Sequence, residues 1–188
     1  MNKLLTVLLL FIACLSSVCH SEEGPVALVK TSQGSFRILL DPNKAPISVE
    51  NFISYAESGF YEGTVFHRTI ADFMIQGGGF TGELAQKPTG DPIKNESSNG
   101  LSNVRGTIAM ARTSAPNSAT AQFFINVVDN PYLDYQKGRS GYAVFGKVID
   151  GMEVVDKIAN TPTIRKGAFT DLPKDIIFIE SVEIESPQ

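Results

Sequence analysis

Short runs rich in β-branched and aromatic residues, each bounded by turn residues, divide most of the chain and predict β-strands. The first two runs flank Ser32-Gln33-Gly34 and predict a hairpin. In the last run, apolar Val182 and Ile184 alternate with two glutamates, as in a strand with one buried face. The expected strands cover residues 26–31, 35–40, 64–68, 73–76, 107–111, 122–127, 143–148 and 176–184.

Two stretches instead repeat their apolar residues at the spacing of a helix. The first covers residues 46–58; Pro46 suits its first turn, and Gly59 suits the position after its end. Its apolar stripe would cover one open end of a sheet or barrel and consists of Val49, Phe52, Ile53 and Ala56. A second helix is expected over residues 152–159, with inward-facing Val154, Val155 and Ile158.

About eight strands and two helices without βαβ alternation argue against a parallel sheet. A closed antiparallel barrel with helices at its ends fits, because closure removes exposed strand edges, but composition alone leaves a sandwich open. Residues 160–174 are expected to form a loop. Residues 81–105 are expected to form a longer loop that is functional or ordered by its own contacts.

The first 21 residues are expected to be a secretory signal peptide outside the fold. Lys3 supplies a positive start, and the apolar run from Leu4 to Ala13 is too short to span a bilayer. Small residues suit cleavage after Cys19 or after Ser21. An uncleaved anchor and a lipoprotein attached at Cys14 are the alternatives.

The remaining residues, 22–188, are long enough for one domain with a sizeable core. The chain is 43% hydrophobic and 19% charged, which is ordinary for a globular protein. Its net charge of -4 gives no general attraction to nucleic acid or to an anionic membrane. Both cysteines lie in the leader, so the mature domain has no disulfide to form and needs a self-sufficient core.

Several kinds of chemistry lack the residues that they require. With His20 in the leader, the mature domain keeps one histidine, His67, so no histidine- or cysteine-rich metal site can form. No calcium-loop spacing is present, and we expect neither a metal nor another cofactor. No motif supplies a nucleophile and an orienting acid for His67, which is expected to be a core or strand histidine with satisfied nitrogens.

Residues 66–80 carry the candidate chemistry. Arg68 and Gln76 are the only long polar side chains in a segment that otherwise has the pattern of buried strand. A mostly apolar pocket with a few placed polar groups is the usual composition of a ligand site, although a hairpin with a solvated arginine fits the same residues. Gly77 to Gly79 mark a β-bulge or a close approach between backbones.

This stretch resembles the signature of the cyclophilin family of peptidyl-prolyl cis-trans isomerases: Phe-His-Arg, a short spacer, then Phe-Met-x-Gln-Gly-Gly. Further blocks at residues 106–111, 122–125 and 144–148 fit the same family. The resemblance runs from residue 26 to 184 and is closest to the exported, periplasmic cyclophilins of bacteria. It implies a mostly β fold, a closed eight-stranded antiparallel β-barrel capped by two α-helices, and an isomerase that assists the folding of exported proteins.

The resemblance also implies the roles of individual residues. Arg68 would be the catalytic donor, and Gln76 would hold either the substrate backbone or Arg68. The pocket for the proline ring would be formed by Phe73, Met74, Phe124 and Leu133. The neighbouring groove, for residues before the proline, would be lined by Ala111, Arg112 and Gln122.

Prolyl isomerisation needs no nucleophile and no proton transfer, because its barrier of about 18–20 kcal/mol is mainly lost amide resonance. Rotation localises a lone pair on the prolyl nitrogen, and a donor aimed at that nitrogen stabilises the twisted state more than the planar state. Arginine suits this role because it is always charged and holds its donors in a planar fork.

The chain departs from the family pattern at two positions of the expected pocket. Many members carry a tryptophan where this chain has Tyr132, and many carry a histidine where it has Tyr142. Tyr142 can still face the proline ring and donate a hydrogen bond. Tyr132 lacks an indole N–H, so we expect cyclosporin to bind weakly. Arg112-Thr113 also replaces a frequent Asn-Ala pair, which leaves the preference of the groove open.

Two other function classes compete with the enzyme. A proline-peptide binding module or holdase could keep the fold, but binding alone would not need Arg68. An adhesion protein would gain support from an added domain or a long tail, and the sequence offers neither. The expected partners are proline-containing, unfolded or flexible exported polypeptides, with no nucleic acid. We expect a periplasmic monomer that contacts no membrane, or an envelope protein if a lipid anchors it.

Overall fold

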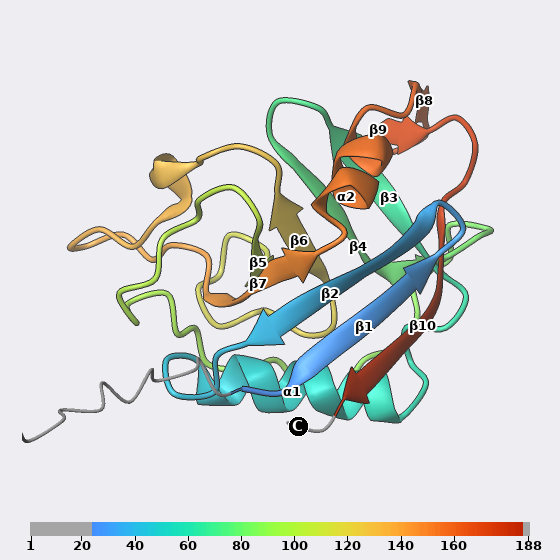
Figure 1. Ribbon diagram of the computed structural model, residues 1–188. Helices are drawn as coiled ribbons and strands as arrows, with labels where there is room; N and C mark the ends of the chain where they lie inside the picture. Colours follow the sequence, from blue (N-terminus) through green and yellow to red (C-terminus); the bar gives the residue numbers. More distant parts are fainter. Residues whose placement is uncertain (1–23, 186–188) are drawn as a thin grey trace, which may run out of the picture.

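Eight strands close into an antiparallel barrel in the computed structural model, which describes residues 24–185 (Figure 1). Their bounds are β1 (Val26–Thr31), β2 (Gly34–Leu40), β3 (Thr64–Ile70), β4 (Met74–Thr81), β5 (Thr107–Met110), β6 (Phe123–Asn126), β7 (Val144–Asp150) and β10 (Phe178–Glu185). The order around the ring is β1-β10-β3-β4-β6-β5-β7-β2. The predicted barrel is therefore confirmed. The predicted signal peptide, with both cysteines, lies outside the described residues.

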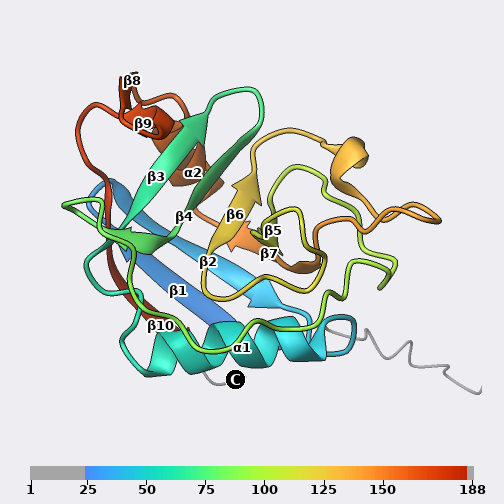
Figure 2. The ribbon, with the colours of Figure 1, turned by 180° about the vertical axis from the view of Figure 1, so that it is seen from behind.

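Helix α1 (Pro46–Glu57) lies across one end of the barrel (Figures 1 and 2). Its buried apolar residues are Val49, Phe52 and Ala56, while Ile53 is half-buried at the edge of the stripe. The ring of Phe52 lies 5.2 Å from that of Tyr61 and 5.3 Å from that of Phe145 on β7. The predicted helix and its stripe are confirmed, and they close this end of the core.

The long loop before β5 supplies the cap that α1 lacks locally. Ala45 at the N-cap position offers no side-chain acceptor. Instead, the carboxylate of Glu96 accepts hydrogen bonds from the backbone N–H of Ile47 at 3.1 Å and of Ser48 at 2.7 Å. A carboxylate at a helix N-terminus accepts hydrogen bonds from the unpaired amides of the first turn and interacts favourably with the helix dipole. At this point the loop is ordered by its own contacts, one of the two possibilities predicted for it.

Helix α2 (Met152–Ala159) packs against β2 and β4 through Val155, Ile158 and Ala159, which are buried. Val154 is only partly buried and lies against Gly34, where a Cβ would approach Val154 Cγ2 to 2.9 Å. Gly34 also has a φ of +131°, which other residues rarely adopt. Glycine therefore fits the turn between β1 and β2 both because no side chain meets Val154 and because it adopts this φ easily. Within the described range, no helix has the length and apolarity needed to cross a membrane.

Residues 160–174 are not the loop that the pattern predicted. Strands β8 (Thr163–Lys166) and β9 (Phe169–Pro173) form a two-stranded hairpin, and β9 lies beside β3 (Figures 1 and 2). All four residues of β8 are exposed, so the segment carries no alternation of buried and exposed positions that a pattern could reveal. The short helix η1 (Pro131–Leu133) was likewise not predicted.

Candidate active site

Strand pairing places the predicted site residues in one row on the outer face of the barrel. Gln76 on β4 pairs with Arg68 on β3 on one side and with Phe124 on β6 on the other. The next partners in the row are Ala109 on β5 and Val144 on β7. Neighbouring residues such as Ile75, Phe123 and Ile125 belong to the core, and successive strand residues point to opposite faces. The row therefore faces outward.

A second hydrophobic cluster, separate from the barrel core, covers this face; we refer to it as the outer apolar cluster. Its buried members are Met74, Ala109, Phe124 and Val144. Partly buried residues packed around them are Ile70, Phe73, Leu101, Ala111, Leu133 and Tyr142. All four residues predicted to hold a proline ring belong to this cluster, so the structure brings them together.

Arg68 lies at the edge of the outer apolar cluster. Its Cζ is 5.7 Å from the centroid of the Phe73 ring, within the range of a cation–π contact. Its Nε is 3.6 Å from Oδ2 of Asp171 on β9, and its side chain is 41% exposed. Asp171 was not predicted, because only the hairpin brings it to β3. No described residue accepts a hydrogen bond from this guanidinium, so both Nη groups remain open to a ligand.

Gln76 is held by Gln122 rather than by Arg68. Nε2 of Gln76 donates a hydrogen bond to Oε1 of Gln122 at 3.0 Å. Among the described residues no hydrogen bond joins Gln76 to Arg68, so of the two predicted roles the one toward the substrate backbone stays a prediction. Oε1 of Gln76 and Nε2 of Gln122 have no partner in the described chain, which leaves one acceptor and one donor for a peptide backbone.

The glycine triplet shapes this part of the sheet, where a β-bulge or a close approach between backbones was predicted, and the bulge is present. The register of β3 against β4 shifts on either side of Phe66. A Cβ at Gly77 would approach Phe66 Cδ1 to 2.9 Å, and Gly78 has a φ of +80°. A Cβ at Gly79 would lie 2.3 Å from Cγ of Gln122. The absence of side chains therefore lets Gln122 lie across β4.

Tyr142 and Arg112 form the other side of the site. The Tyr142 ring meets Phe124 edge-on at 5.5 Å, and Cζ of Arg112 lies 4.5 Å from the Tyr142 ring centroid. Arg112 donates from Nε to the carbonyl of Gly141 at 3.1 Å and from Nη2 to that of Ser140 at 2.8 Å. Arg112 therefore holds the backbone next to Tyr142 and directs its donors to backbone carbonyls.

Tyr132 extends the cluster outward from Phe73. The two rings are stacked with their centroids 6.0 Å apart, and Tyr132 is 55% exposed. Its hydroxyl donates to Oδ1 of Asn130 at 3.0 Å. The hydroxyl is thus already hydrogen-bonded within the protein, while the face of the ring remains accessible.

A network of buried amides behind the cluster was missed by sequence reasoning. Nδ2 of Asn126, which is fully buried, donates to Oγ1 of Thr107 at 2.9 Å. Nδ2 of Asn130 donates to Oδ1 of Asn126 at 2.8 Å and to the carbonyl of Phe73 at 3.0 Å. The network therefore fixes the backbone that carries Phe73. An asparagine ending the apolar run 123–126 was the available signal.

Asp134 anchors the same network at the end of η1. Its Oδ1 accepts hydrogen bonds from the backbone N of Asn103 at 2.7 Å and from Nδ2 of Asn103 at 2.9 Å. Burial alone would raise the pKa of Asp134, but hydrogen bonds from Ser102 and Asn103 outweigh it and lower the pKa. The charged carboxylate thus ties η1, and with it Leu133, to the loop before β5.

His67 is a buried strand histidine, as predicted, but its nitrogens are not both satisfied. Its Nδ1 is buried without a hydrogen-bond partner, because the ring lies between Phe80 at 4.7 Å and Phe169 at 5.9 Å. Burial lowers its pKa to about 4, opposed by the Val65 backbone and reinforced by the charge of Arg68. His67 is therefore neutral near pH 7.

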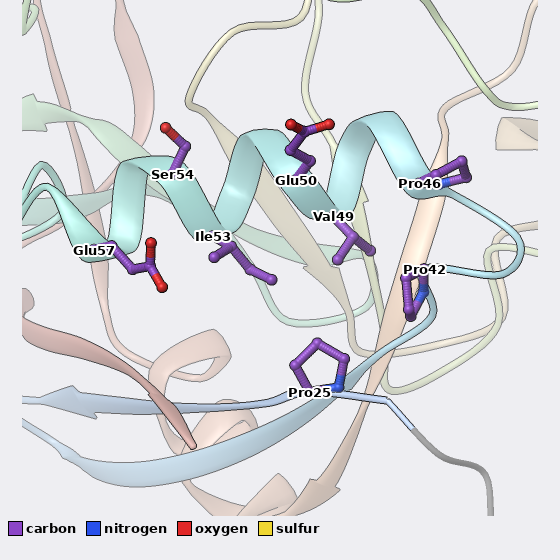
Figure 3. Close-up of a pocket in the computed structure, with 8 residues that line it drawn as sticks. All are labelled: Pro25, Pro42, Pro46, Val49, Glu50, Ile53, Ser54 and Glu57. Atoms are coloured by element: carbon purple, nitrogen blue, oxygen red, sulfur yellow. The ribbon is translucent and has the colours of Figure 1, made fainter. Parts of the chain in front are cut away.

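A separate groove of about 500 Å³ lies between α1 and the start of β1 (Figure 3). Val49 and Ile53 point from the helix toward Pro25 and Pro42. The complete lining is Pro25, Pro42, Pro46, Val49, Glu50, Ile53, Ser54 and Glu57. None of these residues belongs to the outer apolar cluster, so the groove is not part of the candidate site. In residues 24–185, no three His, Cys, Asp or Glu side chains gather to hold a metal.

Known proteins resemble this chain over nearly the whole described range. Residues 26–184 match the family model described as cyclophilin type peptidyl-prolyl cis-trans isomerase/CLD. A peptidyl-prolyl cis-trans isomerase of Acinetobacter baylyi is 56% identical over 167 residues, covering 89% of each chain. Isomerase B of Escherichia coli is 55% identical over 158 residues, covering 82% of this chain and 96% of its own.

Solved structures show the same fold. A cyclophilin type isomerase of Cryptosporidium parvum superposes with a TM-score of 0.72 at 28% identity, covering 87% of this chain and 99% of its own. A structure of that protein in the presence of the dipeptide Ala-Pro superposes with a TM-score of 0.71 at 30% identity, covering 86% of this chain and 99% of its own.

Proposed function

The chain belongs to the cyclophilin family of peptidyl-prolyl cis-trans isomerases, and from this premise we propose that Arg68 and the outer apolar cluster form its catalytic site. The protein is a peptidyl-prolyl cis-trans isomerase, which accelerates rotation about the bond before proline. The observation that carries the assignment of the site is the position of Arg68. Its guanidinium lies over the edge of an apolar surface, with both Nη groups free of described partners.

In this proposal the apolar side chains hold the ring and the polar ones hold the backbone. Phe73, Met74, Phe124 and Leu133 would contact the prolyl ring in its planar and twisted states about equally. The free amide groups of Gln76 and Gln122 would bind the backbone of the residues before proline. Ala111, Tyr132 and Tyr142 would border the bound peptide, and Arg112 would support Tyr142 from behind.

Arg68 would supply the difference between the two states. As the C–N bond rotates, the prolyl nitrogen becomes an acceptor, and a guanidinium N–H aimed at it stabilises the twisted state selectively. No covalent intermediate and no proton transfer is required. An acceleration of ten-thousand-fold would correspond to about 5–6 kcal/mol, shared among Arg68, the apolar contacts and held geometry.

A coupled isomerisation assay on a short Ala-Pro peptide tests this function directly. We expect the purified protein to increase the isomerisation rate in proportion to its concentration. Arg68→Ala should remove most of that increase, and a peptide with proline replaced by alanine should not compete. Full activity in Arg68→Ala would contradict the assigned site, and no activity in the wild type would contradict the enzyme.

The proposed clients are exported polypeptides with proline-limited folding, and the proposed location is the periplasm. The support is the leader-like pattern of residues 1–21, with a lipid-anchored envelope protein as the alternative. Expression of the full chain in a Gram-negative host, followed by intact-mass analysis of the periplasmic fraction, tests this. A mass beginning after Cys19 or Ser21 is expected. A lipidated Cys14 would indicate the lipid-anchored form, an intact leader would indicate the uncleaved anchor, and absence of the protein from both periplasm and envelope would contradict export.

A further inference from the structure

The guanidinium of Arg68 has a carboxylate beside it, and this carboxylate comes from the hairpin that the sequence pattern did not predict. Oδ2 of Asp171 lies 3.6 Å from Nε of Arg68. Asp171 is the one acid that pairs with Arg68 within the described chain. Asp171 contacts the Nε side of the planar guanidinium. The two Nη groups therefore remain available to a bound ligand.

Asp171 is fixed by its neighbours on β9. The side chain of Leu172 is 1% exposed, and the ring of Phe169 packs perpendicular to that of Phe80 on β4 at 5.1 Å. Oγ1 of Thr170 donates to Oδ2 of Asp171 at 2.7 Å. Strand β9 runs beside β3 in both ribbon views (Figures 1 and 2). The carboxylate is therefore held on a packed strand next to the one that carries Arg68.

The Arg68–Asp171 ion pair affects the orientation of the guanidinium more than it affects the stability of the fold. Its side chains are 41% and 32% exposed, and exposed ion pairs stabilise folded proteins only slightly. A half-exposed arginine, however, has many rotamers that compete with a productive one. Phe73 on one side and Asp171 at Nε together restrict the guanidinium to the edge of the outer apolar cluster.

We propose that Asp171 is a positioning residue for Arg68. It holds Nε so that the Nη groups face the prolyl nitrogen of a bound peptide. The inference rests on the proposed role of Arg68 and adds a residue that acts through it without touching the substrate. A misplaced donor stabilises the twisted state less. Loss of Asp171 should therefore lower kcat.

Steady-state kinetics of Asp171→Ala on an Ala-Pro peptide tests the proposal. We expect kcat to fall about tenfold while KM changes less than about twofold. Asp171→Asn should recover little of the loss, because the contact of Asp171 with Arg68 Nε–H at 3.6 Å is an ion pair longer than a hydrogen bond and depends on the charge. In an Arg68→Lys background, which lacks that N–H, Asp171→Ala should cause no further loss. Asp150→Ala is the matched control, since it breaks the exposed pair with Arg37 at 3.3 Å and should leave kcat unchanged.

The outcomes separate this inference from the proposed function. Loss of kcat in Arg68→Ala together with unchanged kcat in Asp171→Ala would overturn the inference alone. Equal losses from Asp171→Ala in the wild-type and Arg68→Lys backgrounds would also overturn it, because they would indicate a general structural effect. Full turnover in Arg68→Ala would overturn the proposed function itself. An NMR order parameter for Arg68 Nε–H provides a test without substitution: restricted motion is expected, and free motion would overturn the inference.

Discussion

The side-chain amides of Gln76 and Gln122 are joined by a 3.0 Å hydrogen bond that crosses from β4 to the residue before β6. The bond exists because residue 79 has no side chain: a Cβ there would lie 2.3 Å from Cγ and 2.7 Å from Nε2 of Gln122. The glycine triplet of the sequence thus determines how the proposed backbone-binding amides are presented.

Gly79→Ala is expected to displace Gln122 and break its bond with Gln76. The overpacking should destabilise the fold by about 1–3 kcal/mol and raise KM for an Ala-Pro peptide. Thermal unfolding and steady-state kinetics measure the two effects. Gly90→Ala is the control, because a Cβ there meets nothing nearer than Tyr55 Oη at 3.6 Å. Unchanged kinetics in Gly79→Ala would show that the amide pair does not contribute to substrate binding.

Arg68→Ala is expected to lower kcat and kcat/KM together by at least about a hundredfold, because the guanidinium acts mainly on the twisted state. Peptide affinity, measured by titration, should stay nearly constant. Arg68→Lys should restore little activity, since a point charge lacks the planar fork. Arg37→Ala removes an exposed arginine that pairs with Asp150 and Glu185, and it should keep normal turnover.

Folding stability is expected to fall between pH 6.5 and pH 4 because of His67. The unfolded chain binds a proton near the ordinary pKa of about 6.5, whereas the buried ring binds one only near its lowered pKa of about 4. Protonation below pH 6.5 therefore favours the unfolded state, and the loss saturates below pH 4. The shift corresponds to a loss on the order of 3 kcal/mol. Chemical denaturation of wild type and His67→Phe across this range measures it; identical pH dependence would contradict the assignment.

Turnover, in contrast, should stay nearly flat from about pH 6 to pH 9. No step of the proposed mechanism transfers a proton, and the lowered pKa of His67 lies below this range. A pH profile of kcat on an Ala-Pro peptide provides the measurement. A profile that follows the titration of a histidine would show that the proposed mechanism is wrong.

Asn126→Ala is expected to destabilise the protein by about 2–4 kcal/mol, because it removes the buried hydrogen bonds that Asn126 makes with Thr107 and Asn130. Since Asn130 holds the Phe73 carbonyl, KM for the peptide should rise as well. Urea denaturation and kinetics measure the two effects. Asn160→Ala, which removes an exposed hydrogen bond to the Asp156 carbonyl, should change stability by less than about 0.5 kcal/mol. Equal effects of the two substitutions would argue against the network.

Tyr132→Trp is expected to tighten cyclosporin binding, which should be weak in the natural chain. The hydroxyl of Tyr132 already donates a hydrogen bond to Asn130. The tyrosine ring also cannot place a donor where an indole N–H would lie. Calorimetric titration of both proteins provides the comparison, with Tyr135→Trp as a control on a similarly exposed ring. An unchanged affinity in Tyr132→Trp would contradict this explanation.

The sequence by itself determined the parts of this protein that depend on local pattern. Apolar periodicity located α1, α2 and most barrel strands, because amphipathic stripes and β-rich runs are properties of neighbouring residues. The glycine triplet predicted a bulge or a close approach between backbones, and the bulge is present. The family resemblance of the motif blocks selected the barrel over the sandwich and named four residues that the outer apolar cluster brings together, Phe73, Met74, Phe124 and Leu133.

Only the tertiary structure decided which distant groups meet. No local pattern pairs Arg68 with Asp171, since the contact depends on a hairpin whose first strand is exposed throughout. The amide network around Asn126 and the orphan nitrogen of His67 were also invisible, because hydrogen bonding in a buried site depends on the partners that folding brings near. The family resemblance predicted the residues of the apolar surface, and the pairing of strands decided how its polar groups are oriented.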